Sequence, residues 1–206
     1  MKIQPYKTLK SYIKSDLKEK KSIFLAKAYP VGNKDEVANI LINLKKIHYD
    51  ASHLCYAYRL LSGKSKFSDA GEPSGTAGIR ILNAINHFGL ENCLLVVIRY
   101  FGGTKLGIGS LGKAYYSAAF QVLSESNIIT KKPFLQAEMK LPLASFNKLK
   151  SVLASNQIKV VETVYNSEIS FKLQIPFELL GKIKSKMMEI LKGEVVIAVK
   201  DEIIYK

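Results

Sequence analysis

Apolar and polar residues alternate along this chain with two distinct periods. Between residues 34 and 47 apolar side chains recur at three- and four-residue intervals, which predicts an amphipathic helix. The same period predicts helices over 76–88 and 110–123, and runs of β-branched and aromatic residues predict strands over 22–30, 53–61 and 93–101. A polar stretch over 62–74 is expected to form a loop. Together these elements predict an α/β unit.

The remainder of the chain predicts the order strand, helix, strand, strand, helix, strand. The expected ranges are 134–141, 145–155, 158–165, 168–175, 177–191 and 194–204. This β-α-β-β-α-β order, with a short turn over 165–167, is that of a ferredoxin-like domain. Because the periodicity breaks over 127–133, we expect a linker there and two domains, 1–130 and 131–206, in an α+β protein.

A glycine-rich segment joins the strand over 93–101 to the helix that follows it. It contains Lys105 and Lys113, so an anion is the first ligand to consider. Residues 107–112 match the dinucleotide pattern G-x-G-x-x-G, but five residues separate them from their strand. Residues 107–113 match G-x-x-x-x-G-K, but Ala114 replaces the Ser or Thr hydroxyl that a P-loop uses to bind magnesium. We therefore expect neither ATP nor NAD to bind, and no cofactor.

A second polar, glycine-rich segment over 68–78 precedes the helix over 76–88. Ser74 or Thr76 is expected to cap the first free N–H groups of this helix. The positive end of the helix, with Ser68 and Gly75 nearby, is a candidate anion site. Each glycine-rich segment links a strand of one sheet to a helix, so we expect the two to converge in one cleft.

The acidic residues Asp69 and Glu72 of this segment allow two interpretations. They can act with His53 as general acid and base, or hold magnesium, which prefers carboxylate oxygens. Alternatively, both carboxylates fix the loop by accepting backbone N–H groups. The second interpretation is favoured, because one acidic pair carries little catalytic specificity.

Composition narrows the class of protein. The chain has 206 residues, is 48% hydrophobic and carries a formal net charge of +14, which favours a polyanionic partner. No run approaches the roughly 20 apolar residues of a membrane span, and the first residues lack a signal-peptide core. Cys55 and Cys93 lie in apolar runs, so we expect buried, reduced thiols and a cytoplasmic protein without membrane contact.

Three segments together resemble one known family. They are HLCYAYR over His53–Arg59, SDAGEPSGTAG over Ser68–Gly78 and RYFGGTKLG over Arg99–Gly107. In this order they resemble the IMPACT/YigZ family. The resemblance implies an N-terminal domain of the ribosomal protein S5 domain 2-like type and a ferredoxin-like C-terminal domain. Such a pair is similar to the last two domains of translation elongation factor G, which implies contact with RNA or the ribosome and a role in translation or its regulation.

The chain departs from the family pattern at several positions. Ala70 stands where a second Asp is common, which weakens any catalytic or metal role of paired acids in that loop. Arg80 stands where Pro is common, and Ser110 with Gly112 replace a Gly and a larger apolar residue. Lys113 takes the place of an Arg, so it meets phosphate without the bidentate fork of a guanidinium.

The leading hypothesis from the sequence is a non-enzymatic nucleic-acid- or ribosome-binding protein with a basic, glycine-rich cleft. The nucleic-acid-binding candidates are Arg99, Tyr100, Lys105, Lys113, Lys64 and Lys66. The loop and anion-site candidates are Ser68, Asp69, Glu72, Ser74, Gly75, Thr76, Gly102 and Gly103. No residue is assigned as catalytic or metal-binding. Two alternatives stay open: a small hydrolase or metal-dependent enzyme using Asp69 and Glu72, and a protein-interaction module that docks a translation-associated protein.

Overall fold

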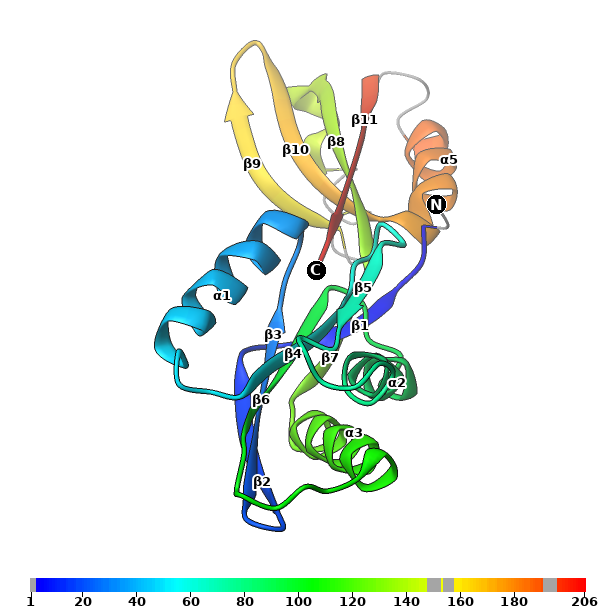
Figure 1. Cartoon of the computed structure of the whole chain (residues 1–206). Helices are drawn as coiled ribbons and strands as arrows, with labels where there is room; N and C mark the ends of the chain where they lie inside the picture. The colour runs from blue at the N-terminus through cyan, green and yellow to red at the C-terminus, as the bar shows by residue number, and fades with distance from the viewer. Residues whose placement is uncertain (1–2, 148–152, 154–157, 191–195) are drawn as a thin grey trace. The chain divides into compact units, whose positions relative to one another are not determined.

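The computed structural model describes residues 3–147, 153, 158–190 and 196–206 (Figure 1). The chain forms two compact units. The first unit is Tyr6–Thr130, and the second comprises Lys131–Lys206 together with the residues before Tyr6. No helix formed by the described residues combines the length and apolar character needed to cross a bilayer.

A five-stranded antiparallel sheet organises the first unit. Its strand order is β2-β3-β6-β4-β5, and the strands are β2 (Ile13–Glu19), β3 (Ser22–Pro30), β6 (Cys93–Tyr100), β4 (His53–Arg59) and β5 (Ser65–Ser68). The short strands β1 (Tyr6–Leu9) and β7 (Ile128–Lys131) pair separately. The central position of β6 follows from its continuous apolar run, since a strand covered on both faces needs no polar side.

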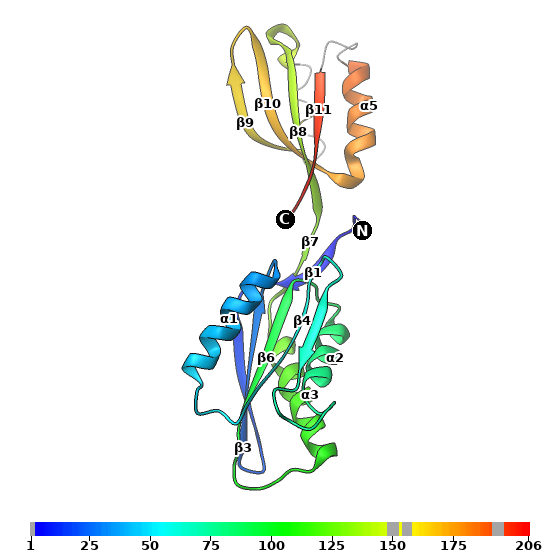
Figure 2. The ribbon, with the colours of Figure 1, turned by 45° about the horizontal axis from the view of Figure 1, so that its top comes forward.

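Helices cover both faces of this sheet. Figures 1 and 2 show α1 (Lys34–Ile47) on one face and α2 (Gly78–Phe88) with α3 (Ile108–Ser124) on the other. The alternation of β6 divides its side chains accordingly: Leu95 and Val97 join the core under α2 and α3, while Val96 and Ile98 join the core under α1. The helices predicted over 34–47, 76–88 and 110–123 are thus confirmed within two residues at each end.

The second unit has a four-stranded antiparallel sheet in the order β11-β8-β10-β9. Its strands are β8 (Pro133–Pro142), β9 (Lys159–Tyr165), β10 (Glu168–Pro176) and β11 (Val196–Tyr205). Helix α5 (Leu180–Ile190), preceded by a short 3-10 turn over Phe177–Leu179, packs on the sheet through Ile183 and Met187. Counted along the chain within this unit, the strands lie in the order fourth, first, third, second. This is the ferredoxin-like order, as predicted. Most of the helix predicted over 145–155 lies outside the described residues.

Four of the observed strands were not predicted from the sequence. Three of them, β1, β5 and β7, have only four residues each, and the fourth, β2, is a charged edge strand with the sequence IKSDLKE. The loop predicted over 62–74 therefore contains β5. The segment predicted as a linker over 127–133 contains β7 and the start of β8, and the boundary between the two units, after Thr130, lies within it. Short or polar segments become strands here because neighbouring strands offer hydrogen-bond partners, which local sequence does not reveal.

Candidate functional site

Asp69 fixes the loop between β5 and α2. Its Oδ1 accepts the backbone N–H groups of Ala77 at 3.0 Å and Gly78 at 2.7 Å, and its Oδ2 accepts that of Gly75 at 3.0 Å. Burial alone would raise the pKa of Asp69, but these three donors hold the pKa below its usual value. Asp69 thus has the loop-fixing role favoured by the sequence.

The cap predicted for α2 is wrong. The Thr76 hydroxyl donates to the carbonyl oxygen of Pro73 at 2.6 Å, and Ser74 is exposed. Ser68 acts locally, because its hydroxyl accepts the backbone N–H of Ala70 at 3.2 Å. The carboxylate of Asp69 neutralises the positive end of α2, so this helix end does not offer the anion site expected from the sequence.

Glu72 joins the two glycine-rich segments through a buried ion pair. Its Oε1 lies 2.8 Å from Nη1 of Arg99 at the end of β6, and the hydroxyl of Tyr115 on α3 donates to the same oxygen at 2.7 Å. The side chains of Arg99 and Glu72 are only 7% and 3% exposed. The guanidinium also lies 5.5 Å from the ring centroids of Phe24 and Phe101. This geometry gives Arg99 a structural role instead of the surface phosphate contact expected from the sequence.

His53 and Cys55 extend this polar network along β4. Nδ1 of His53 donates to the carbonyl oxygen of Ala70 at 3.0 Å, and its Nε2 faces Oε2 of Glu72 at 3.8 Å. The thiol of Cys55 donates to the carbonyl oxygen of Asp69 at 2.9 Å. Burial raises the pKa of Cys55 to about 12, so the thiol stays protonated and is a poor nucleophile.

This network supports the loop-fixing interpretation for Asp69 only. Among the described residues, Glu72 accepts the side chains of Arg99 and Tyr115 and no backbone N–H, so the expectation that both carboxylates accept backbone N–H groups is wrong for Glu72. Both oxygens of Asp69 and Oε1 of Glu72 already accept protein donors, which favours structural roles over acid–base catalysis. Within the described residues, no group of three or more His, Cys, Asp or Glu side chains is arranged to hold a metal ion.

The loop between β6 and α3 is held against the β2–β3 turn. The backbone N–H of Gly102 donates to the Ser22 hydroxyl at 3.2 Å. A Cβ atom at Gly102 would lie 2.0 Å from the carbonyl carbon of Lys21, so only glycine fits. Gly103 and Lys105 are exposed in the same loop. The two glycine-rich segments therefore meet through the buried pair of Glu72 and Arg99, and Lys105 remains available at the surface.

An open groove of about 400 Å³ lies between α2 and α3. Arg80 and Asn83 line it from α2, and Lys113 with Tyr116 line it from α3. Gly112 forms part of its wall, and a Cβ atom there would lie 3.3 Å from Nε of Arg80. Lys113 is a binding candidate from the sequence, whereas Arg80 is distinguished there only as a departure from the family pattern. The usable signal was the pairing of Arg80 with Asn83 at three-residue spacing on one helix.

The remaining predicted residues do not gather in this groove. Tyr100 turns to the α1 face, where its hydroxyl lies 2.7 Å from Nδ1 of His48. Lys64 lines a separate pocket of about 230 Å³ with Arg59 and Glu91, and Lys66 is exposed on β5. Since Arg59 pairs with Cys93 and His53 pairs with Arg99, Lys64 lies at the opposite end of the sheet from the glycine-rich segments.

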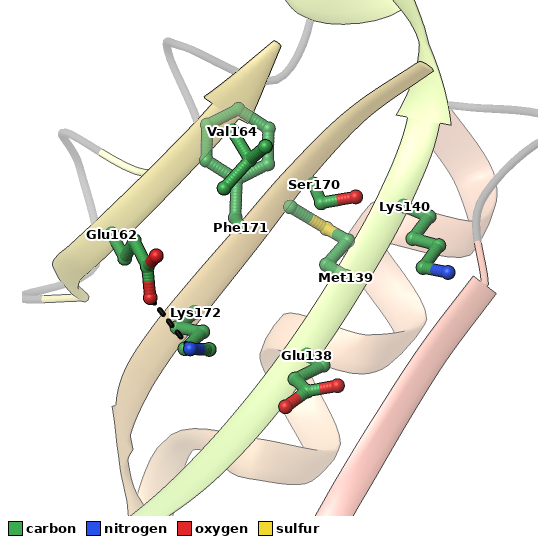
Figure 3. Close-up of a pocket in the computed structure, with 8 residues that line it drawn as sticks. All are labelled: Glu138, Met139, Lys140, Glu162, Val164, Ser170, Phe171 and Lys172. Carbon is green, nitrogen blue, oxygen red and sulfur yellow. Dashed lines mark ion pairs between the residues drawn. The ribbon is translucent and has the colours of Figure 1, made fainter. Parts of the chain in front are cut away.

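The sheet of the second unit offers a contrasting surface, shown in Figure 3. Lys172 on β10 pairs with Glu162 on β9 at 2.6 Å, and Glu138 on β8 pairs with Lys200 on β11 at 2.8 Å. The side chains that line this pocket include one aromatic ring, that of Phe171, which is 3% exposed. Paired charges and a buried ring do not make a stacking platform for bases.

Comparisons with known proteins place this architecture in a family. A family model described as the Impact N-terminal domain matches residues 20–123. The chain is 31% identical over 156 residues to the IMPACT family member in pol 5'region of Thermus thermophilus, covering 76% of this chain and 85% of that protein. It is 27% identical over 194 residues to the IMPACT family member YvyE of Bacillus subtilis, covering 93% of this chain and 89% of that protein.

A solved structure supports the same assignment at the level of fold. The crystal structure of a hypothetical protein superposes with a TM-score of 0.68 over 98% of this chain and 100% of that one, at 23% identity. This likeness shows that the α+β fold is shared. The match of the family model and the identity to the curated relatives show that this chain belongs to the IMPACT family.

Proposed function

We propose that this protein binds RNA or the ribosome through its first unit and acts in translation without being an enzyme. The observation that carries the proposal is the groove between α2 and α3, where Arg80 and Lys113 face one open space. Among the residues that the structure describes, neither cation has a carboxylate within ion-pairing distance. Two unpaired cations beside one groove suit the phosphates of a nucleic-acid backbone.

The other groove residues complete this chemistry. Gly109 is exposed and has no side chain, so a phosphate backbone can approach the helix closely at this position. Asn83 supplies an amide, and Tyr116 supplies a ring and a hydroxyl. The net charge of +14 adds a long-range attraction for polyanions, and the exposed Lys105 adds a further cation. The resemblance of the two-domain order to the end of elongation factor G supports a partner in translation.

The proposal is tested by binding and co-sedimentation. The protein is titrated into a fluorescein-labelled oligouridylate, and separately sedimented with ribosomes before and after nuclease treatment. In Arg80→Gln/Lys113→Gln, the slope of log affinity against log salt should fall by about 1.4, because each lost phosphate contact on a single strand contributes about 0.7. Lys45→Gln/Lys46→Gln on the exposed end of α1 is the matched control and should keep the full slope.

Two results would contradict the proposal. The first is failure of the unmodified protein to bind the oligonucleotide and to sediment with ribosomes. The second is equal binding by both double variants, which would remove the groove from the interface. Sedimentation that survives complete removal of RNA would instead favour the docking of a translation-associated protein.

A further inference from the structure

The turn between β2 and β3 has an unusual backbone for its sequence. Glu19 pairs with Ser22, so only Lys20 and Lys21 form the turn. Both have positive φ, 44° for Lys20 and 66° for Lys21. Two-residue hairpins with two positive φ angles normally contain Asn-Gly, because side chains with a Cβ are strained there. Local strain of this kind is concentrated at functional sites, so the two lysines in this conformation are candidates for a functional role.

The turn is fixed to the loop that follows β6. Gly102 contacts the backbone of Lys21 so closely that no Cβ fits between them, and its N–H is bonded to Ser22. Lys105 lies three residues beyond Gly102, which places their Cα atoms within about 11 Å of each other. Lys20, Lys21 and Lys105 are all exposed. The half-buried Glu19 is the acidic residue at this turn. Three exposed cations therefore lie in the region of this turn and the adjoining loop.

An aromatic ring lies in the same loop. Phe101 is 49% exposed, and its backbone N–H donates to the Ser52 hydroxyl at 3.1 Å. Its ring is held by the guanidinium of Arg99, 5.5 Å from the centroid. The buried pair of Arg99 with Glu72 fixes that guanidinium in turn. Phe101 is thus an exposed ring on a rigid support, which lowers the entropic cost of stacking on it.

We propose that Lys20, Lys21, Lys105 and Phe101 form a second contact for single-stranded RNA, separate from the groove between α2 and α3. The lysines bind successive phosphates, and the ring of Phe101 stacks on an intervening base. The inference rests on the proposed function, because it extends the surface that binds the same partner. Single-stranded RNA presents phosphates and bases in alternation, so a site that binds it needs both cations and an aromatic ring. This surface has both, on a backbone that is held in place.

The first test removes both turn lysines without harming the fold. Lys20→Asn/Lys21→Gly installs the favoured pair for this turn, so its unfolding temperature should equal or exceed that of the unmodified protein. Its affinity for labelled oligouridylate should fall about tenfold at 0.15 M salt, with the salt slope lower by about 1.4. A variant that folds at least as well and binds less tightly cannot be explained by misfolding. Lys45→Gln/Lys46→Gln again controls for net charge.

The outcomes separate this inference from the proposed function. Unchanged affinity and slope in the turn variant, with binding lost in Arg80→Gln/Lys113→Gln, would overturn the second contact alone. Failure of the unmodified protein to bind oligouridylate and ribosomes would overturn both proposals.

The second test examines stacking. The chain has no tryptophan, so Phe101→Trp introduces a single tryptophan fluorophore. We expect oligouridylate to quench its emission and an abasic oligomer with the same number of phosphates to leave it nearly unchanged. Equal responses to the two oligomers, or no response to either, would overturn the stacking role of residue 101. A response to vesicles of anionic phospholipid with none to RNA would overturn the choice of RNA as the partner.

Discussion

Replacing Glu72 by Gln removes the negative charge from a buried ion pair while keeping the shape of the side chain. Arg99 would then remain cationic at 6% exposure, and its Nε already has no hydrogen-bond partner among the residues that the structure describes. Opposite charges about 4 Å apart attract by about 4 kcal/mol at an effective dielectric constant of about 20. Breaking a buried pair by removing one partner typically costs about 3–5 kcal/mol, which agrees. We therefore expect Glu72→Gln to lower the free energy of unfolding by about that amount.

The assay is urea denaturation followed by circular dichroism, with hydrogen exchange of β6 amides to assign the transition of the first unit. A double-mutant cycle adds Arg99→Met and the combined variant. Each single variant leaves one buried charge unpaired, whereas the combined variant leaves none, so the combined loss should be clearly smaller than the sum of the two single losses.

A catalytic role for Glu72 makes the opposite prediction. Substituting an active-site carboxylate commonly leaves the free energy of unfolding unchanged or raises it, because active sites sacrifice stability for function. A loss below about 1 kcal/mol in Glu72→Gln, or simple additivity in the cycle, would therefore refute the structural interpretation.

Two further predictions follow from close contacts. Gly102→Ala should lower the free energy of unfolding by about 3 kcal/mol or more in urea denaturation, since its Cβ would lie 2.0 Å from backbone, whereas Gly109→Ala, with open space around it, should be neutral or slightly stabilising. Burial and Lys27 hold the pKa of His48 below 6.5, although Asp50 opposes them, so the folded state takes up this proton at lower pH than the unfolded state. Stability should therefore fall as pH drops below about 6.5, and thermal denaturation of His48→Gln should lose this component, whereas an identical pH profile in that variant would contradict the assignment.

Much of the fold could be predicted because its main elements carry strong local patterns. The apolar run of β6 and the periodic apolar residues of α1 each specify their element without help from the rest of the chain. The edge strand β2 has no such pattern, because it carries several charged residues that are exposed to solvent. It forms a strand because β3 supplies its hydrogen-bond partners. Elements that depend on a neighbour for their hydrogen bonds were the ones missed.

The candidate site was predicted only in part for a similar reason. Arg99 ends an apolar strand and its sequence neighbours include no acid, so it was assigned to the surface. Its partner Glu72 is 27 residues away, and only the packing of the loop against β6 brings the two together. The turn lysines were missed because lysine is not a residue type that predicts a positive φ. Long-range contacts and backbone strain are properties of the fold that local sequence does not contain.

Two departures from the family pattern acquire one physical explanation in the structure. A larger apolar residue at position 112 would occupy the space that Nε of Arg80 now takes, because even a Cβ atom there would lie 3.3 Å from it. Gly112 therefore makes room for Arg80, and Arg80 joins Lys113 in the groove. Meanwhile Asp69 already occupies the positive end of α2. The proposed phosphate contact on this face therefore rests on the side chains of Arg80 and Lys113, and we expect their removal to abolish binding at the groove even with both glycine-rich loops intact.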